Sequence, residues 1–149
     1  MFFSKLAIAA SFLATALAGP LAAPSGEGAQ LAKRSNGIHL LNCVTYSAVV
    51  YCDDDSNCNF NPGPGNECVP KDHLNGIGIE IWEQSGSCRF DTGTTFSWTI
   101  QSNAQQQPNF ATVGSGTNGF QGFTIRKDDQ HVMFTDGNGH ACRSIYYAL

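Results

Sequence analysis

The chain carries little charge for its length. Its 149 residues include 8 Lys and Arg, 12 Asp and Glu and 4 His, and basic residues never form a run longer than a pair. Nucleic acids and anionic lipid surfaces attract clustered Lys and Arg, so this composition favours neither of them as a partner.

A second long apolar segment is absent. The single apolar run, Leu6–Ala18, is shorter than the roughly 20 residues that span a bilayer, so we expect no membrane anchor. Lys5 precedes this run, which ends in the small residues of Ala16-Leu17-Ala18. These features are typical of a secretory signal peptide over residues 1–18.

The stretch after the signal peptide is rich in Ala, Gly, Pro and Ser and ends at Lys33-Arg34. This dibasic pair resembles the sites cut by kexin-type proteases of the fungal secretory pathway. We therefore expect a pro-segment over residues 19–34 and a secreted, extracellular mature chain, a single domain, over residues 35–149. Loss of Lys5, Lys33, Arg34 and Glu27 would leave 11 acidic and 5 basic residues, a formal charge of −6.

No C-x-x-C pair occurs, which argues against a zinc site of the usual ligand spacing. An even number of cysteines in a small secreted chain instead indicates a disulfide framework, so we expect three bridges and no cofactor. The sequence leaves the pairing open. The six cysteines are Cys43, Cys52, Cys58, Cys68, Cys88 and Cys142.

Apolar residues at helical spacing are scarce, whereas short apolar runs with two-residue alternation recur between turn-forming residues. Gly76–Trp82 is the strongest predicted strand, with Ile77, Ile79 and Ile81 on one face. Thr94–Ile100 is a second, with Phe96, Trp98 and Ile100 inward. Two more strands are predicted within Gly37–Cys52. The pattern predicts an all-β fold, a small antiparallel β-sandwich or barrel stapled by disulfides.

The C-terminal third predicts a three-stranded meander over Phe120–Arg126, His131–Thr135 and Cys142–Ala148. Asp136-Gly137-Asn138-Gly139 suits the tight turn between the last two strands. We expect Gln101–Gly119 to form a long loop or loosely paired edges. We also expect Asp53–Asp72 to be irregular, followed by at most a helical turn at Pro70–Asn75.

No catalytic set stands out. The segment His131–Asn138 resembles a strand and turn of the small guanyl-specific fungal ribonucleases. That family has an arginine at the place of His131 and a histidine where this chain has Tyr146, so the resemblance implies an incomplete catalytic set. A hydrolase would have to use His131, His140, Arg126 and a carboxylate, and a cleft in which they converge would support that alternative.

Binding sites have only weak candidates. Asp53 and Asp55 offer oxygen ligands for a cation, but their loop departs from the EF-hand pattern, so we expect no metal. Trp82, Tyr146 and Tyr147 could supply aromatic surface for stacking on a glycan.

The signal peptide, the pro-segment ending in Lys33-Arg34 and the cysteine-rich mature chain together resemble the small secreted cysteine-rich proteins of filamentous fungi. That group includes effectors that act on host plants, associated with virulence, and antifungal or killer-toxin-like proteins. The resemblance implies a non-enzymatic, effector-like protein that binds a host protein or a glycan of a host or cell wall. The alternatives are a small secreted hydrolase, ribonuclease-like or glycan-directed, and an antifungal or killer-toxin-like protein.

Overall fold

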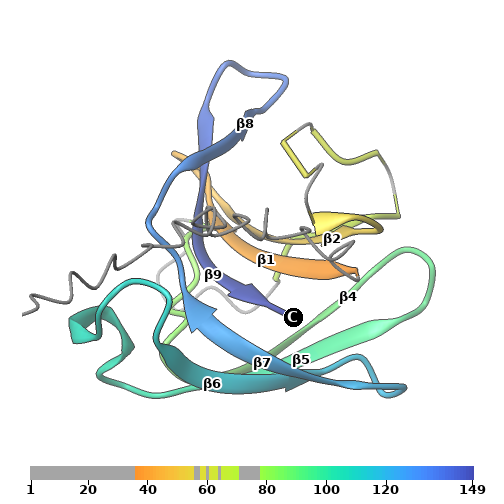
Figure 1. Cartoon of the computed structure of the whole chain (residues 1–149). Helices are drawn as coiled ribbons and strands as arrows, with labels where there is room; N and C mark the ends of the chain where they lie inside the picture. The colour runs from red at the N-terminus through yellow and green to blue at the C-terminus, as the bar shows by residue number, and fades with distance from the viewer. Residues whose placement is uncertain (1–35, 56–57, 60, 64, 71–77) are drawn as a thin grey trace, which may run out of the picture. The chain divides into compact units, whose positions relative to one another are not determined.

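A computed structural model describes residues 36–55, 58–59, 61–63, 65–70 and 78–149. These residues form an almost entirely antiparallel β-structure, a nearly closed barrel-like sheet without an α-helix among them (Figure 1), which confirms the predicted fold class. The expected signal peptide and pro-segment lie outside the described residues, as does most of the expected helical turn at Pro70–Asn75.

Over the described part of the chain, the sheet contains nine strands. Their bounds are β1 (Gly37–Asn42), β2 (Ser47–Cys52), β3 (Glu67–Cys68), β4 (Ser85–Arg89), β5 (Thr95–Ile100), β6 (Thr112–Thr117), β7 (Gly122–Lys127), β8 (Val132–Thr135) and β9 (Ala141–Ala148). A short 3-10 helix, η2 (Ala104–Gln106), lies between β5 and β6. The strand order is β3-β2-β1-β9-β7-β6-β5-β4, and β8 pairs with β9 outside this path.

The three C-terminal strands form where the sequence predicts them, but they do not pair in the order of the predicted meander, because β9 and not β8 is the middle strand. Its first residues pair with β8 and its last residues pair with β7. The turn before β9 places Gly139 at φ 84°, the left-handed backbone that glycine adopts without steric cost.

All six cysteines are bridged, which confirms the predicted framework. Cys43–Cys142 joins the end of β1 to β9, and Cys52–Cys58 closes a short loop after β2. Cys68–Cys88 joins β3 to β4, the two strands at opposite ends of the sheet order. This third bridge links the two edges that hydrogen bonds leave open.

Two apolar clusters lie on opposite faces of β1 and β2. Residues alternate along a strand, so Ile38 and Leu40 join the larger cluster, which includes Phe96, Trp98 and Ile100 of β5 as predicted. Leu41 lies on the other face, in a smaller cluster that includes two residues of β8 and the four cysteines Cys43, Cys52, Cys58 and Cys142. Because both faces are covered, β1 and β2 are buried almost throughout.

The predicted strand at Gly76–Trp82 is wrong in its described part. Residues 78–84 form no strand, and β4 begins only at Ser85. Ile81, on the face that the isoleucines were expected to share, is 46% exposed, while its neighbour Trp82 is 1% exposed. Trp82 has more apolar surface to bury than Ile81. Its indole Nε1 donates to Asn42 Oδ1 at 2.8 Å, so burial does not leave this N–H without a hydrogen-bond partner.

The expectation of a loop or loose edges at Gln101–Gly119 is also wrong for its second half. β6 is an interior strand that pairs with both β5 and β7. Its glycines, which suggested a loop, allow close packing. A β-carbon on Gly114 would lie 2.2 Å from the Thr99 carbonyl oxygen, and one on Gly116 would lie 2.5 Å from the Phe96 ring.

Candidate functional site

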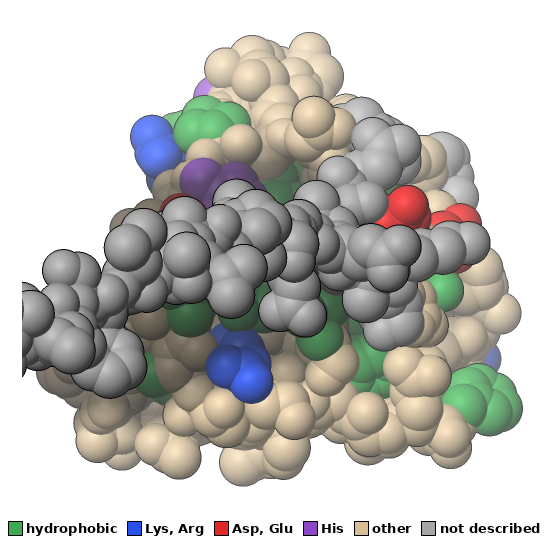
Figure 2. All heavy atoms as spheres, in the orientation of Figure 1, with side chains coloured by type: hydrophobic (Ala, Val, Ile, Leu, Met, Phe, Trp, Pro, Cys, Tyr) green, Lys and Arg blue, Asp and Glu red, His purple; other side chains and the backbone are tan. Residues whose placement is uncertain are grey.

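A pocket of about 330 Å³ lies where the loop after β2 approaches the segment between β7 and β8; we call it the His39–His131 pocket. Figure 2 shows histidine side chains reaching the surface beside hydrophobic ones in the upper half of the view, the half that holds β8 in Figure 1. The pocket gathers two histidines, three aspartates and two aromatic rings. It is lined by His39, Asp55, Cys58, Asn59, Phe110, Asp128, Asp129, His131, Val132, Met133 and Tyr147.

An irregularity in β9 brings its polar side chains to this pocket. Leu40 pairs with Tyr146, but Leu41 pairs with Ser144, so Ile145 is an extra residue on β9. Without this bulge, Ser144 and Tyr147 would face opposite sides of the sheet, since they are three residues apart. The bulge instead places both of them on the face of β1 that carries His39.

His39 is fully engaged in a buried hydrogen-bond network. Its Nε2 lies 2.7 Å from Asp55 Oδ1, and its Nδ1 lies 3.0 Å from Ser144 Oγ. The Ser144 hydroxyl in turn donates to Asp128 Oδ2 at 2.5 Å. With Asp55 at Nε2 and Ser144 at Nδ1, both ring nitrogens of His39 have a partner within the protein, and neither is left for a ligand.

The second histidine is available to a ligand. The side chain of His131 is about half exposed, and its Nδ1 lies 2.6 Å from Asp129 Oδ1 and 3.6 Å from Asp128 Oδ1. The hydrogen bonds from His131 lower the pKa of Asp129 below its usual range. A carboxylate that orients an imidazole through one nitrogen leaves the other nitrogen for proton transfer or for a ligand.

Two residues beside the pocket have left-handed backbone. Phe110 has φ 69° and Gln130 has φ 63°, values that are uncommon outside glycine. Arginine side chains hold both segments, because Arg126 Nη1 donates to the Phe110 carbonyl at 3.2 Å and Arg143 Nη1 donates to the Gln130 carbonyl at 3.0 Å. These contacts hold the backbone of Phe110 and of Gln130, which precedes His131, beside the pocket.

Side chains with metal-ligating atoms also meet here. One donor atom each from Asp128, Asp129 and His131 lie within 4.8 Å of one another and could hold a divalent cation. His39 lies equally close to Cys52 and Cys58, but that sulfur pair is a disulfide and offers no thiolate. The candidate ligand Asp53 is exposed, while Asp55 is directed to His39.

The structure separates the residues of the predicted hydrolase set. His131 lines the pocket, whereas His140 and Arg126 are not among its lining residues. His140 instead pairs with Asp136 across the β8–β9 turn, with Nδ1 and Oδ2 3.4 Å apart. Ser144 is 0% exposed, so no nucleophilic hydroxyl from the buried network reaches the pocket.

The predicted glycan-stacking residues also lie apart. Trp82 and Tyr146 are buried in the larger core, so their rings present no surface to a glycan, and only Tyr147 lines the pocket. The Tyr146 hydroxyl donates to Glu83 Oε1 at 2.5 Å. Burial and this contact with Glu83 raise the pKa of Tyr146 well above its usual value.

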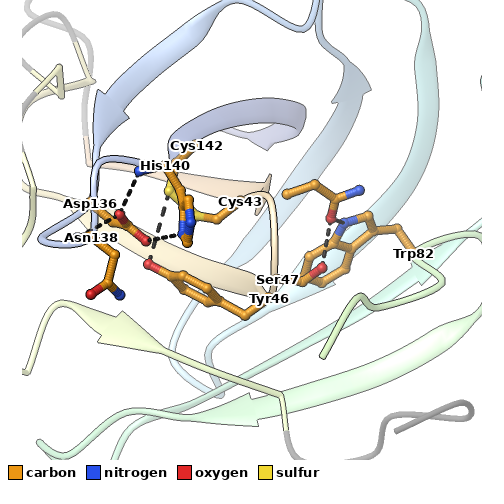
Figure 3. The surroundings of a disulfide bond; sticks show 9 residues. Cys43, Tyr46, Ser47, Trp82, Asp136, Asn138, His140 and Cys142 are labelled. Atoms are coloured by element: carbon orange, nitrogen blue, oxygen red, sulfur yellow. Dashed lines mark hydrogen bonds and ion pairs between the residues drawn. A yellow bond between two sulfur atoms is a disulfide. The ribbon is translucent and has the colours of Figure 1, made fainter. Parts of the chain in front are cut away.

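A polar cluster surrounds the Cys43–Cys142 disulfide (Figure 3). The Tyr46 hydroxyl lies 3.9 Å from Cys142 Sγ, and Asp136 accepts backbone N–H bonds from Asn138 and His140. Burial, with the nearby charges of Glu67 and Asp136, raises the pKa of Tyr46 to about 12. These groups hold the β8–β9 turn against the start of β2.

Sequence reasoning missed His39, Asp128, Asp129 and Ser144. One signal was present, because a histidine inside the apolar segment Ile38–Leu41 has to find hydrogen-bond partners if the strand is buried. The partners themselves gave no signal. Lys127–Gln130 has the composition of an exposed turn, and only the bulge in β9 aims Ser144 at His39.

Comparisons with protein-family models, with curated proteins and with solved structures found no match to this chain. Among the described residues, no helix is long and apolar enough to cross a membrane. The three disulfides are compatible with an extracellular protein.

Proposed function

We propose that this is a secreted, effector-like protein that acts without catalysis by binding a component of a host or of a cell wall in the His39–His131 pocket. The observation that carries the proposal is the hydrogen bonding of the buried polar residues at the pocket. His39, Ser144 and Asp128 are hydrogen-bonded to one another. They therefore form a rigid surface that suits the binding of a ligand and does not present a reactive hydroxyl.

The lining favours a ligand with a positively charged or hydrogen-bond-donating group. Three carboxylates face two imidazoles in the pocket, and the rings of Phe110 and Tyr147 add faces that attract cations. The exposed pair of Asp129 and His131 provides the first polar contact.

Processing is part of the proposal. Cleavage after Arg34 would start the mature chain at Ser35, immediately before the described residues. The intact mass of protein secreted from the full-length chain tests this point. A mass that retains residues 19–34 in a host with an active dibasic protease would contradict it.

A pull-down from host extract and a wall-polysaccharide binding assay test the binding function. Wild type, His131→Ala and His140→Ala serve as baits, since both histidines pair with an aspartate but only His131 lines the pocket. We expect one set of ligands to be retained by wild type and by His140→Ala and lost by His131→Ala. Equal retention by all three baits would contradict binding in this pocket.

The oriented pair of His131 and Asp129 supports one alternative, a secreted hydrolase. Loss of an acid–base group lowers turnover by about 10²- to 10⁴-fold. If wild type cleaves RNA or a wall polysaccharide and His131→Ala loses that rate, the protein is a hydrolase. We expect equal, negligible turnover in both.

A further inference from the structure

A hollow of about 300 Å³ opens at one end of the barrel-like sheet and shares no described lining residue with the His39–His131 pocket. Its lining comes from the start of β1, the end of β2, the segment before β3, the β4–β5 turn and the β6–β7 turn. We call it the Phe120 groove; Ile38 and Phe90 are its buried lining residues. Ligand sites are common at the mouths of β-barrels, where the turns of several strands meet.

Phe120, in the β6–β7 turn, is the most exposed large apolar side chain of the described residues, with 88% of its surface open to solvent. Side chains fix the turn that presents it. Asn118 Oδ1 accepts the backbone N–H groups of Phe120 and Gln121, each at 2.9 Å, and the Thr117 hydroxyl donates to the Gln121 carbonyl at 2.9 Å. A ligand that covers this ring therefore buries apolar surface without first having to order the backbone.

A second hollow, of about 550 Å³, adjoins the groove, and Phe120 lines both. The β4–β5 and β6–β7 turns lie at the same end of the sheet, because Ser97 in β5 pairs with Thr117 at the end of β6 (Figure 1). Thr92 and Thr94 of the first turn, like Asn118 of the second, are shared by the two linings. A chain-like ligand can thus lie over the Phe120 ring with a unit in each hollow.

The linings of the two hollows exclude charge. None of their described residues is Asp, Glu, Lys, Arg or His. Amide and hydroxyl groups take their place, and the side chains of Asn36, Asn66 and Thr94 are partly exposed, so a ligand can reach them. Amides and hydroxyls both donate and accept hydrogen bonds. The lining therefore suits a neutral ligand rich in hydroxyls, whereas an ionic group would lose water without gaining a partner of opposite charge.

An extended peptide fits this end of the sheet less well. Peptides bind sheets by adding a strand to an open edge. The strands β5, β6 and β7 each pair with a strand on both sides, so they offer no such edge beside the turns that carry Phe120 and Thr94.

We propose that the Phe120 groove binds a neutral oligosaccharide, with one sugar ring stacked on Phe120 and its hydroxyls hydrogen-bonded to Asn66 and Thr94. The face of an aromatic ring is electron-rich and attracts the C–H groups on the face of a sugar. The site goes beyond the function proposed for the His39–His131 pocket and does not rest on it.

The test uses secreted protein produced from the full-length chain. Calorimetry measures binding of three neutral hexamers, of β-1,3-linked glucose, β-1,4-linked glucose and β-1,4-linked mannose. The β-1,4-linked glucosamine hexamer is the matched charged probe, because it exchanges one hydroxyl of each glucose for an ammonium group. NMR locates the site through the amide signals of Gly65 and Gly119, which lie at the two hollows, and the imidazole signals of His131. We expect at least one neutral hexamer to bind and to shift the glycine signals but not those of His131.

Variants of exposed residues separate recognition from folding. Phe120→Ala should weaken binding about tenfold or more, the effect of no longer covering a phenyl ring, without changing the melting temperature. Phe120→Trp, which keeps an aromatic face, should bind at least as well as wild type. Val44→Ala, at a 66% exposed apolar residue of the β1–β2 turn, should bind as wild type does. Thr94→Val removes one hydroxyl and should weaken binding about threefold or more.

Four results would overturn the proposal. They are no binding of any neutral hexamer, unchanged binding in Phe120→Ala, a glucosamine hexamer that binds as tightly and is equally lost in Phe120→Ala, and binding that shifts the His131 signals and is lost in His131→Ala. The last result would place the oligosaccharide in the His39–His131 pocket, so the two proposed sites succeed or fail separately.

Discussion

Gly37 and Asp55 fit together so closely that a β-carbon on Gly37 would lie 2.3 Å from Asp55 Oδ1. The same oxygen lies 2.7 Å from Nε2 of the buried His39. The glycine at the start of β1 therefore makes room for the carboxylate that holds the histidine. A substitution at Gly37 has to act on His39 through Asp55.

Gly37→Ala is predicted to destabilise the protein by about 1–3 kcal/mol, the cost of leaving a buried polar group without its partner. Urea unfolding measures the change. Asp55→Ala should cost a similar amount, and the double variant should cost less than the sum, because Gly37→Ala has nothing left to displace once Asp55 is gone.

Gly122→Ala is the matched control, since a β-carbon on Gly122 meets no atom within 4 Å. We expect its stability to stay within about 0.5 kcal/mol of wild type. Strict additivity of Gly37→Ala and Asp55→Ala would show that the two residues act independently.

The Cys68–Cys88 bridge is predicted to stabilise the protein more than the Cys52–Cys58 bridge. It spans 20 residues instead of 6, which in the chain-entropy account makes it worth about 1 kcal/mol more. It also links the edge strands β3 and β4, whose unpaired backbone groups can pair with other molecules when the edges separate.

Double alanine variants of each bridge test this difference by urea unfolding and light scattering. We expect Cys68→Ala/Cys88→Ala to lose more stability than Cys52→Ala/Cys58→Ala and to associate at high concentration. Equal losses in two monomeric variants would rule out a special role for the bridge between the edges.

The fold class was predictable because its signals are local. The alternation of Phe96, Trp98 and Ile100 alone specifies β5 and its buried face, and the even number of cysteines indicates three bridges. β6 was missed because Gly114 and Gly116 mark either a loop or a close approach of backbones, and the sequence does not show the Thr99 carbonyl that lies against Gly114.

The candidate site was less predictable because it depends on long-range contacts. His39 and Ser144 are 105 residues apart in sequence, and they meet only because β1 pairs with β9 with an irregular register. The segment around Ile79 and Trp82 shows a related limit. Apolar alternation there identified a periodic face, but the size of Trp82 and its bond to Asn42 decided which face is buried.

Tyr46 is predicted to ionise near pH 12 while the protein is still folded, because burial, Glu67 and Asp136 all raise its pKa. Ultraviolet absorbance follows tyrosine ionisation, and circular dichroism in the same titration reports the fold. The difference between wild type and Tyr46→Phe isolates the transition. Glu67→Gln should lower the midpoint only in part, since burial is the largest cause. A Tyr46 midpoint near 10 in the folded protein would contradict the described environment.

Asp136 is predicted to make stability fall in acid. The backbone N–H of His140, followed by that of Asn138 and the charge of His140, lowers the pKa of Asp136 against the opposing effect of desolvation. A carboxyl group whose pKa is lower in the folded state stabilises the protein above its unfolded value, about 3.9, and this contribution is lost as the pH falls through the folded value.

Asp136→Asn keeps the shape of the side chain and removes the charge. We expect it to melt at a lower temperature than wild type at pH 7, because a neutral amide is a weaker acceptor for the two N–H groups, and we expect the difference to shrink as the pH falls below about 3.9. Asp91→Asn, at an exposed carboxylate in the β4–β5 turn, controls for net charge. Melting curves from pH 7 to pH 2 measure both variants. A difference in melting temperature between wild type and Asp136→Asn that stays constant over this range would contradict the prediction. It would show that the negative charge of Asp136 does not stabilise the turn, and that the two N–H bonds act equally well on a neutral acceptor.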